Sequence, residues 1–82
     1  MLVHHYVLVY DQRLGRLIPP IEDFTDSAIG MQRRFELERK YREDARIEVV
    51  MLSAESEEQI RSTHSRYFKT TAELLDDLRA LK

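Results

Sequence analysis

The most restrictive feature of the sequence is an apolar run near the N-terminus, residues 3–10, whose side chains favour a β-strand. Successive side chains of a strand point to opposite faces, so Val7 and Val9 share one face while Leu8 and Tyr10 share the other. Leaving each large apolar side chain in water would forgo about 1.5–3 kcal/mol, against a total stability of about 5–15 kcal/mol for a small domain. Both faces therefore need cover, and we expect this strand at the centre of a sheet.

Two further strands are predicted on either side of it. Asp11 and Gly15 suit the start and the end of a hairpin loop, because Asp accepts turn hydrogen bonds and Gly adopts positive φ. The returning strand is expected to cover only residues 16–18, because Pro19–Pro20 cannot donate hydrogen bonds to a ladder. Residues 47–52 form the third strand, with one charge and no proline. The simplest connection gives an antiparallel sheet of order 2-1-3 with two open edges.

A first helix is predicted between the second and third strands. We expect Thr25 to cap its N-terminus and the helix to end near Glu43. The apolar residues at helical spacing that should face the sheet are Ala28, Met31 and Phe35. Leu37 and Tyr41 fall off this stripe, so we expect them on the opposite side of the helix.

The C-terminal third of the sequence predicts two more helices. Ser56 followed by Gln59 resembles a capping box and starts a helix over 56–68, and a similar signature starts a leucine-rich helix over 71–81. The element order is therefore ββαβαα. We expect an α+β fold, with a small three-stranded antiparallel sheet packed with helices, in a single compact domain over 1–82.

Composition excludes several functional classes. The 82 residues contain no cysteine, which excludes disulfides, thiolate metal sites and cysteine nucleophiles. Thirteen basic and fifteen acidic residues give a formal net charge of −2, so no general field attracts nucleic acid or anionic lipid. No window approaches the roughly 18 apolar residues of a membrane span, and no signal-peptide pattern is present. We expect a cytoplasmic protein without metal, cofactor or membrane contact.

The three histidines do not have the spacing of a metal site or of a catalytic group. His4 and His5 are consecutive in a strand, so their side chains leave opposite faces and cannot share one metal ion. His64 occupies an apolar helical position, where a hydrogen-bonded residue at the edge of the core is expected rather than a general base. An alternative that rests on side-chain type alone is a small polar site formed by Arg61, His64 and Tyr67.

Basic residues in the first helix support an alternative function. Arg33, Arg34 and Lys40 are candidate contacts to a phosphate backbone, which would make the protein a nucleic-acid-binding accessory protein. Glu36 and Glu38 lie among these cations and cancel much of their charge. A solvated face of ion pairs is therefore the interpretation that we prefer.

The remaining apolar surface favours a protein interface. Apolar surface is contributed by the nearly uncharged third strand and by the two residues off the helical stripe. Together they expose more apolar surface than one small monomer can bury. We therefore expect a homodimer that acts as a small interaction or regulatory module without catalytic chemistry, with a further, unidentified protein as a second kind of partner. The expected interface residues are Leu37, Tyr41, Val49, Val50 and Leu52.

Overall fold

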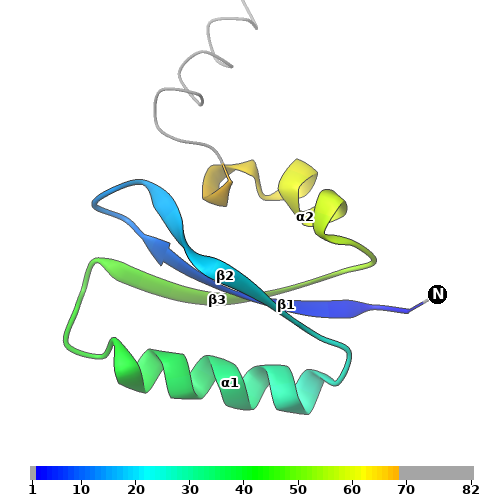
Figure 1. Ribbon diagram of the computed structural model, residues 1–82, viewed down its shortest axis with the longest axis horizontal. Coiled ribbons are helices and arrows are strands. Elements are labelled where there is room, and N and C mark those ends of the chain that lie inside the picture. The colour runs from blue at the N-terminus through cyan, green and yellow to red at the C-terminus, as the bar shows by residue number, and fades with distance from the viewer. Residues whose placement is uncertain (1, 69–82) are drawn as a thin grey trace, which may run out of the picture.

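The fold was obtained as a computed structural model, which describes residues 2–68 (Figure 1). Its elements are β1 (His4–Asp11), β2 (Arg16–Phe24), α1 (Ser27–Lys40), β3 (Ile47–Ala54), α2 (Glu57–Thr63) and the 3₁₀ helix η1 (Ser65–Tyr67). The three strands form one antiparallel sheet in the order β2-β1-β3, so the predicted α+β class and strand order are confirmed. The helix expected over 71–81 lies outside the described residues.

Figure 1 shows α1 on one face of the sheet, and α2 with η1 on the other. The central strand β1 is buried from both sides, and its Leu8 side chain has an exposed fraction of 0%. Val7 and Val9 form a core cluster with Leu37 beneath α1. The opposite cluster contains Tyr6, Leu8, Ile60 and Tyr67. The two helical layers thus provide the cover that both apolar faces of β1 require.

Strand β2 is longer than expected, because it continues through the proline pair to Phe24. The register with β1 shifts at this point: Ile18 lies opposite Val9, whereas Glu22 lies opposite Val7. Three residues of β2 therefore face the single residue between these partners, and the prolines lie inside this bulge. The prediction of a strand that stops at residue 18 is wrong, because a bulge on an edge strand accommodates residues that cannot donate to the ladder.

The ends of α1 also differ from the prediction. Asp26, not Thr25, is the N-cap, and its carboxylate accepts hydrogen bonds from the backbone N–H groups of Ala28 and Ile29. A carboxylate at this position also complements the positive end of the helix dipole. The helix ends at Lys40 rather than near Glu43, and a tight loop then leads into β3.

The face of α1 that contacts the sheet is not the stripe that the sequence suggested. Gly30 lies closest to the sheet, since a Cβ atom there would stand 3.1 Å from the Met51 sulfur. Leu37, two turns further along, is buried with an exposed fraction of 4%, and Tyr41 packs against the same cluster. Phe35 is 53% exposed instead. The prediction that placed Leu37 and Tyr41 on the far side is wrong, because a glycine without a side chain marks the closest contact.

The helix predicted over 56–68 is interrupted. The Ser56 hydroxyl caps α2 by accepting from the Gln59 N–H at 3.1 Å, as the capping box predicts. At His64 the backbone leaves helical geometry, with φ −125° and ψ 49°, and η1 follows. This break brings Tyr67 into the core beneath η1.

A pair of substitutions tests which face of α1 contacts the sheet. Gly30→Leu should lower the free energy of unfolding by about 1–3 kcal/mol, because the added side chain overfills the contact with Met51. Ala28→Leu is the control, since Ala28 is exposed and should tolerate the same side chain. Urea denaturation of both variants measures the difference. Equal losses would contradict the observed orientation of α1.

Candidate interaction surface at the open edge of the sheet

The outer edge of β3 is the most open element of the described structure. In residues 2–68, β3 pairs only with β1, and this pairing runs without irregularity from Ala54 to Ile47. The opposite edge of the sheet belongs to β2, whose prolines and bulge discourage pairing with another strand. The β3 edge contains neither a proline nor a bulge.

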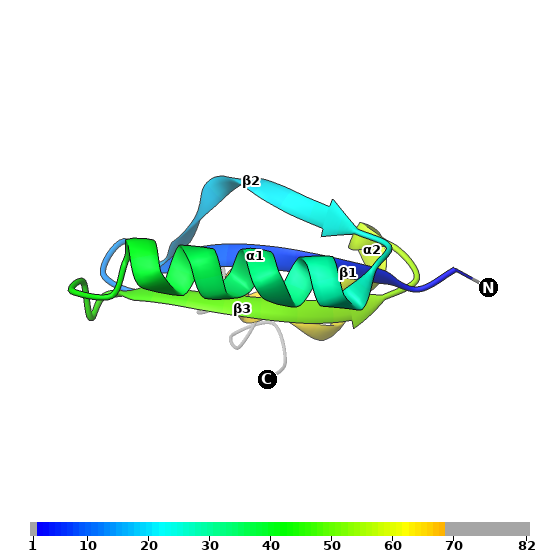
Figure 2. The same ribbon diagram turned by 90° about the horizontal axis from the view of Figure 1, so that it is seen from below.

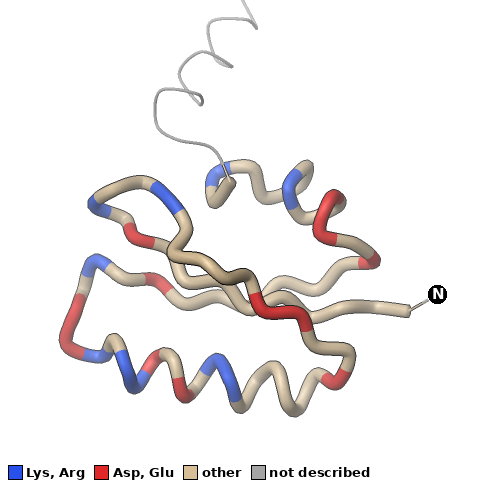
Figure 3. Tube along the Cα trace, in the orientation of Figure 1, with Lys and Arg blue, Asp and Glu red and all other residues tan. Residues whose placement is uncertain are grey.

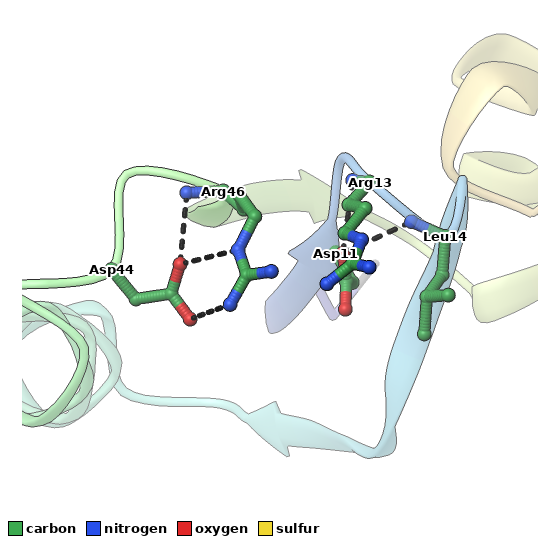
Figure 4. A network of polar contacts seen from close by, with 5 residues as sticks. All are labelled: Asp11, Arg13, Leu14, Asp44 and Arg46. Carbon is green, nitrogen blue, oxygen red and sulfur yellow. Dashed lines mark hydrogen bonds and ion pairs between the residues drawn. The ribbon is translucent and has the colours of Figure 1, made fainter.

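Two loops at one end of the sheet are held by aspartate carboxylates (Figure 4). The Asp11 carboxylate accepts from the N–H groups of Arg13 and Leu14, while the Asp44 carboxylate binds Arg46. The hydrogen bond from Arg46 lowers the pKa of Asp44. Between the two loops, the Gln12 N–H donates to the Arg46 carbonyl at 2.8 Å, which extends the β1–β3 ladder by one hydrogen bond.

This bond fixes the alternation along β3. Hydrogen-bonded and non-hydrogen-bonded pairs alternate in an antiparallel ladder, so Glu48, Val50, Leu52 and Ala54 direct their backbone groups toward β1. The N–H of Ile47 accordingly donates to the Asp44 carbonyl and not to β1. The backbone N–H groups of the next alternate residues point away from the sheet: Val49, Met51 and Ser53.

Glu48 is the one charged residue of β3, but its carboxylate does not protect the outer edge. It accepts hydrogen bonds from Gln12 Nε2 at 3.0 Å, Arg66 Nη2 at 3.0 Å and the Tyr67 hydroxyl at 2.9 Å. The bond from Gln12, followed by those from Tyr67 and Arg66, lowers the pKa of Glu48 in spite of its partial burial. Figure 3 shows that the rest of the β3 trace carries no charge.

The structure divides the five predicted interface residues among different surroundings. Leu37 is buried beneath α1 and is not accessible to a partner, and half-buried Tyr41 packs beside it. Val49 points toward α1, whereas Val50 and Leu52 pack toward α2. Along the open edge, β3 thus presents its outward backbone groups, whose positions depend on the register with β1.

The three residues of the predicted polar site make separate contacts. Arg61 binds Glu57 at 2.6 Å and stacks over the Phe68 ring at 4.6 Å. His64 Nδ1 lies 2.9 Å from the hydroxyl of the neighbouring Thr63. Arg61 and Tyr67 line a common hollow of about 290 Å³, but His64 is not part of its wall. Arg61 and His64 thus contact different neighbours, and the three side chains do not line one common hollow.

The candidate phosphate contacts on α1 are engaged in ion pairs, in the case of the two arginines, and in a contact with an aromatic ring, in the case of Lys40. Arg33 Nε binds Glu22 at 2.9 Å and its Nη1 binds Glu36 at 3.2 Å. Arg34 binds Glu38 at 2.8 Å. Lys40 Nζ lies 5.3 Å from the centre of the Tyr41 ring. These contacts are typical of a solvated helix face.

The histidines contact two residues that the sequence reasoning did not single out. His4 Nδ1 lies 2.8 Å from an Asp23 oxygen, and His5 Nδ1 lies 2.7 Å from the Ser53 hydroxyl. His5 and Ser53 are cross-strand partners in a non-hydrogen-bonded pair, where side chains are closest. The register, once known, predicts this contact. Within residues 2–68, no cluster of three or more potential metal ligands is found.

No family model matches the chain, and no match is found among curated proteins or solved structures. Among the helices that the structure describes, none is long and apolar enough to cross a membrane. The functional interpretation therefore depends on the geometry of the β3 edge.

The hydrogen bonds to Glu48 predict a dependence of stability on pH. They lower its pKa in the folded state, so their contribution is complete above the ordinary carboxyl value of 4.5 and is lost as the pH falls through the lower folded-state pKa. Glu48→Gln should cost about 1–3 kcal/mol at neutral pH, because a charged acceptor of three bonds is replaced.

Urea denaturation between neutral and acid pH measures this effect. The loss of stability toward acid pH should be smaller in Glu48→Gln than in the wild type. Glu43→Gln is the matched control, since Glu43 is exposed. If the two variants have the same pH profile, the contacts of Glu48 do not contribute as proposed.

Proposed function

We propose that the protein is a small, non-enzymatic interaction module, and that its partner is a second copy bound through the edge of β3. The observation that carries this proposal is the row of outward N–H groups on an unbroken, uncharged edge, from Val49 to Ser53. Such an edge is a template for another strand, and natural proteins usually block it with charge, proline or a bulge.

A second copy satisfies this edge by symmetry. Two β3 strands that pair antiparallel are related by a two-fold axis, so the same patch serves both copies and the assembly closes as a dimer. Each outward N–H and carbonyl then gains a partner, at about 0.5–1.5 kcal/mol per hydrogen bond. The two three-stranded sheets would join into one sheet of six strands.

The alternative function, nucleic-acid binding, has less support. It depends on Arg33 and Arg34, whose guanidinium groups are already held by glutamates of the same chain. A phosphate backbone would have to compete with these ion pairs. The interaction module depends instead on backbone groups that have no partner in the described part of the chain.

Proline substitutions on β3 test the proposal with a positional control. The wild-type protein should be a dimer at micromolar concentration by light scattering. Val49→Pro should be a folded monomer, because the N–H that it removes points outward. Val50→Pro is the control: it removes a bond to β1 and should unfold the protein.

Circular dichroism separates loss of folding from loss of association. If Val49→Pro does not fold, Ser53→Pro supplies the same test, since the Ser53 N–H also points outward and its side chain is exposed. A monomeric wild-type protein, or outward-facing proline variants that remain folded dimers, would contradict pairing through this edge.

A further inference from the structure

One flank of α1 carries apolar side chains that are exposed or half-buried in the described structure. Phe35 is 53% exposed, and Met31, one turn before it, is half-buried. Phe35 lies in a shallow hollow together with Glu38, Arg39 and Arg42. An aromatic side chain surrounded by polar groups is typical of a protein interface.

The ion pairs of α1 show which way this flank points. Gly30 and Leu37 face the sheet, and Arg33 leans toward β2, where it binds Glu22. In a helix, Met31 and Phe35 then project from the opposite flank. Figure 2 shows α1 running along the sheet with β2 on one side and β3 on the other. Met31 and Phe35 are thus on the β3 side of α1, and Phe35 is turned further from the sheet than Met31.

The spacing of a continuous sheet brings two such flanks together. The helix lies closer to β1 and β3 than to β2. Neighbouring strands are about 4.8 Å apart, so a helix over the β1–β3 pair and its symmetry mate across a β3–β3 junction would have axes roughly 10 Å apart. Packed helices have interaxial distances of about 8–10 Å. Edge pairing would therefore place the two α1 helices in contact.

We propose that α1 of a second copy packs antiparallel against this flank, with Met31 and Phe35 of each copy in the contact. This inference rests on the proposed function, because the two-fold axis of the β3 junction creates it. The helix contact adds buried surface area to the strand pairing. A stable interface buries about 1,200–2,000 Å², and one pair of short strands buries less. Contacts between thioether sulfur and aromatic ring add to the apolar burial.

The charges on the flank are compatible with an identical partner. Arg34 and Glu38 neutralise each other at 2.8 Å, so two copies bring no net charge together at this point. The basic residues Arg39 and Arg42 lie near the C-terminal end of α1. Antiparallel packing places them near the N-terminal end of the partner helix, where Asp26 caps the first turn. An identical helix thus fits this flank in the antiparallel orientation.

The absence of cysteine in the sequence allows a direct test by cross-linking. Phe35→Cys should give a covalent dimer with a short bis-maleimide. Ile29→Cys is the matched control, because Ile29 has a similar exposed fraction of 51% but lies on the other flank. It should give several-fold less covalent dimer. Circular dichroism and light scattering check beforehand that both variants are folded and associate.

A second pair of variants measures the contribution of the contact to affinity. Phe35→Glu should raise the dissociation constant of the dimer by at least about tenfold, as expected when an aromatic interface residue is lost. Ile29→Glu should leave it within about twofold, the ordinary effect of a surface substitution. Both sites are exposed in the monomer, so neither variant should unfold it.

The two proposals fail in different ways. If Val49→Pro abolishes the dimer but Phe35→Glu and Ile29→Glu behave alike, edge pairing stands and the helix contact is wrong. If cross-linking at positions 29 and 35 is equal, the helix contact is wrong as well. A monomeric wild-type protein overturns both. Selective cross-linking at position 35, with weaker association of Phe35→Glu, supports the helix contact.

Discussion

The burial of β1 on both faces is the constraint on which the rest of the structure depends. Four consecutive side chains, from Tyr6 to Val9, are buried, so the chain must supply a helical layer on each side and a strand along each edge. One helix, α1, covers one face, and α2 with η1 covers the other. In the described part of the chain, nothing remains to cover the outer edge of β3. Within residues 2–68, the open edge is thus a consequence of how few elements flank the central strand.

The sequence predicted the sheet well because its signal is local and strong. A strand with two apolar faces belongs at the centre of a sheet, and the hairpin and the crossover then determine the strand order. The prediction failed where a tertiary contact overrides a local rule. Pro19 and Pro20 are tolerated because β2 bulges at the edge of the sheet. Gly30 decides which side of α1 contacts the sheet, yet it contributes nothing to an apolar stripe.

The candidate site could be predicted only in part for a related reason. The lack of proline on β3, with a single charge, is visible in the sequence and points to an open edge. Which N–H groups face outward depends on the register and on the hydrogen bond between the Gln12 N–H and the Arg46 carbonyl, and neither is visible in the sequence. The apolar side chain of Leu37 suggests an interface residue, but the structure buries this side chain in the core. Apolar patterns identify what must be buried; they do not distinguish burial by the chain from burial by a partner.

Glu48 shows how the core and the open edge are connected. A charge on an edge strand usually prevents pairing with other strands. Here the backbone groups of Glu48 face β1, and its carboxylate faces η1, where it accepts from Arg66 and Tyr67. The residue that would protect the edge is therefore used inside the monomer to hold η1 on the sheet. The outer edge from Val49 to Ser53 then carries no charged group. Loss of that contact would release a carboxylate beside the edge, where its charge would oppose the proposed strand pairing.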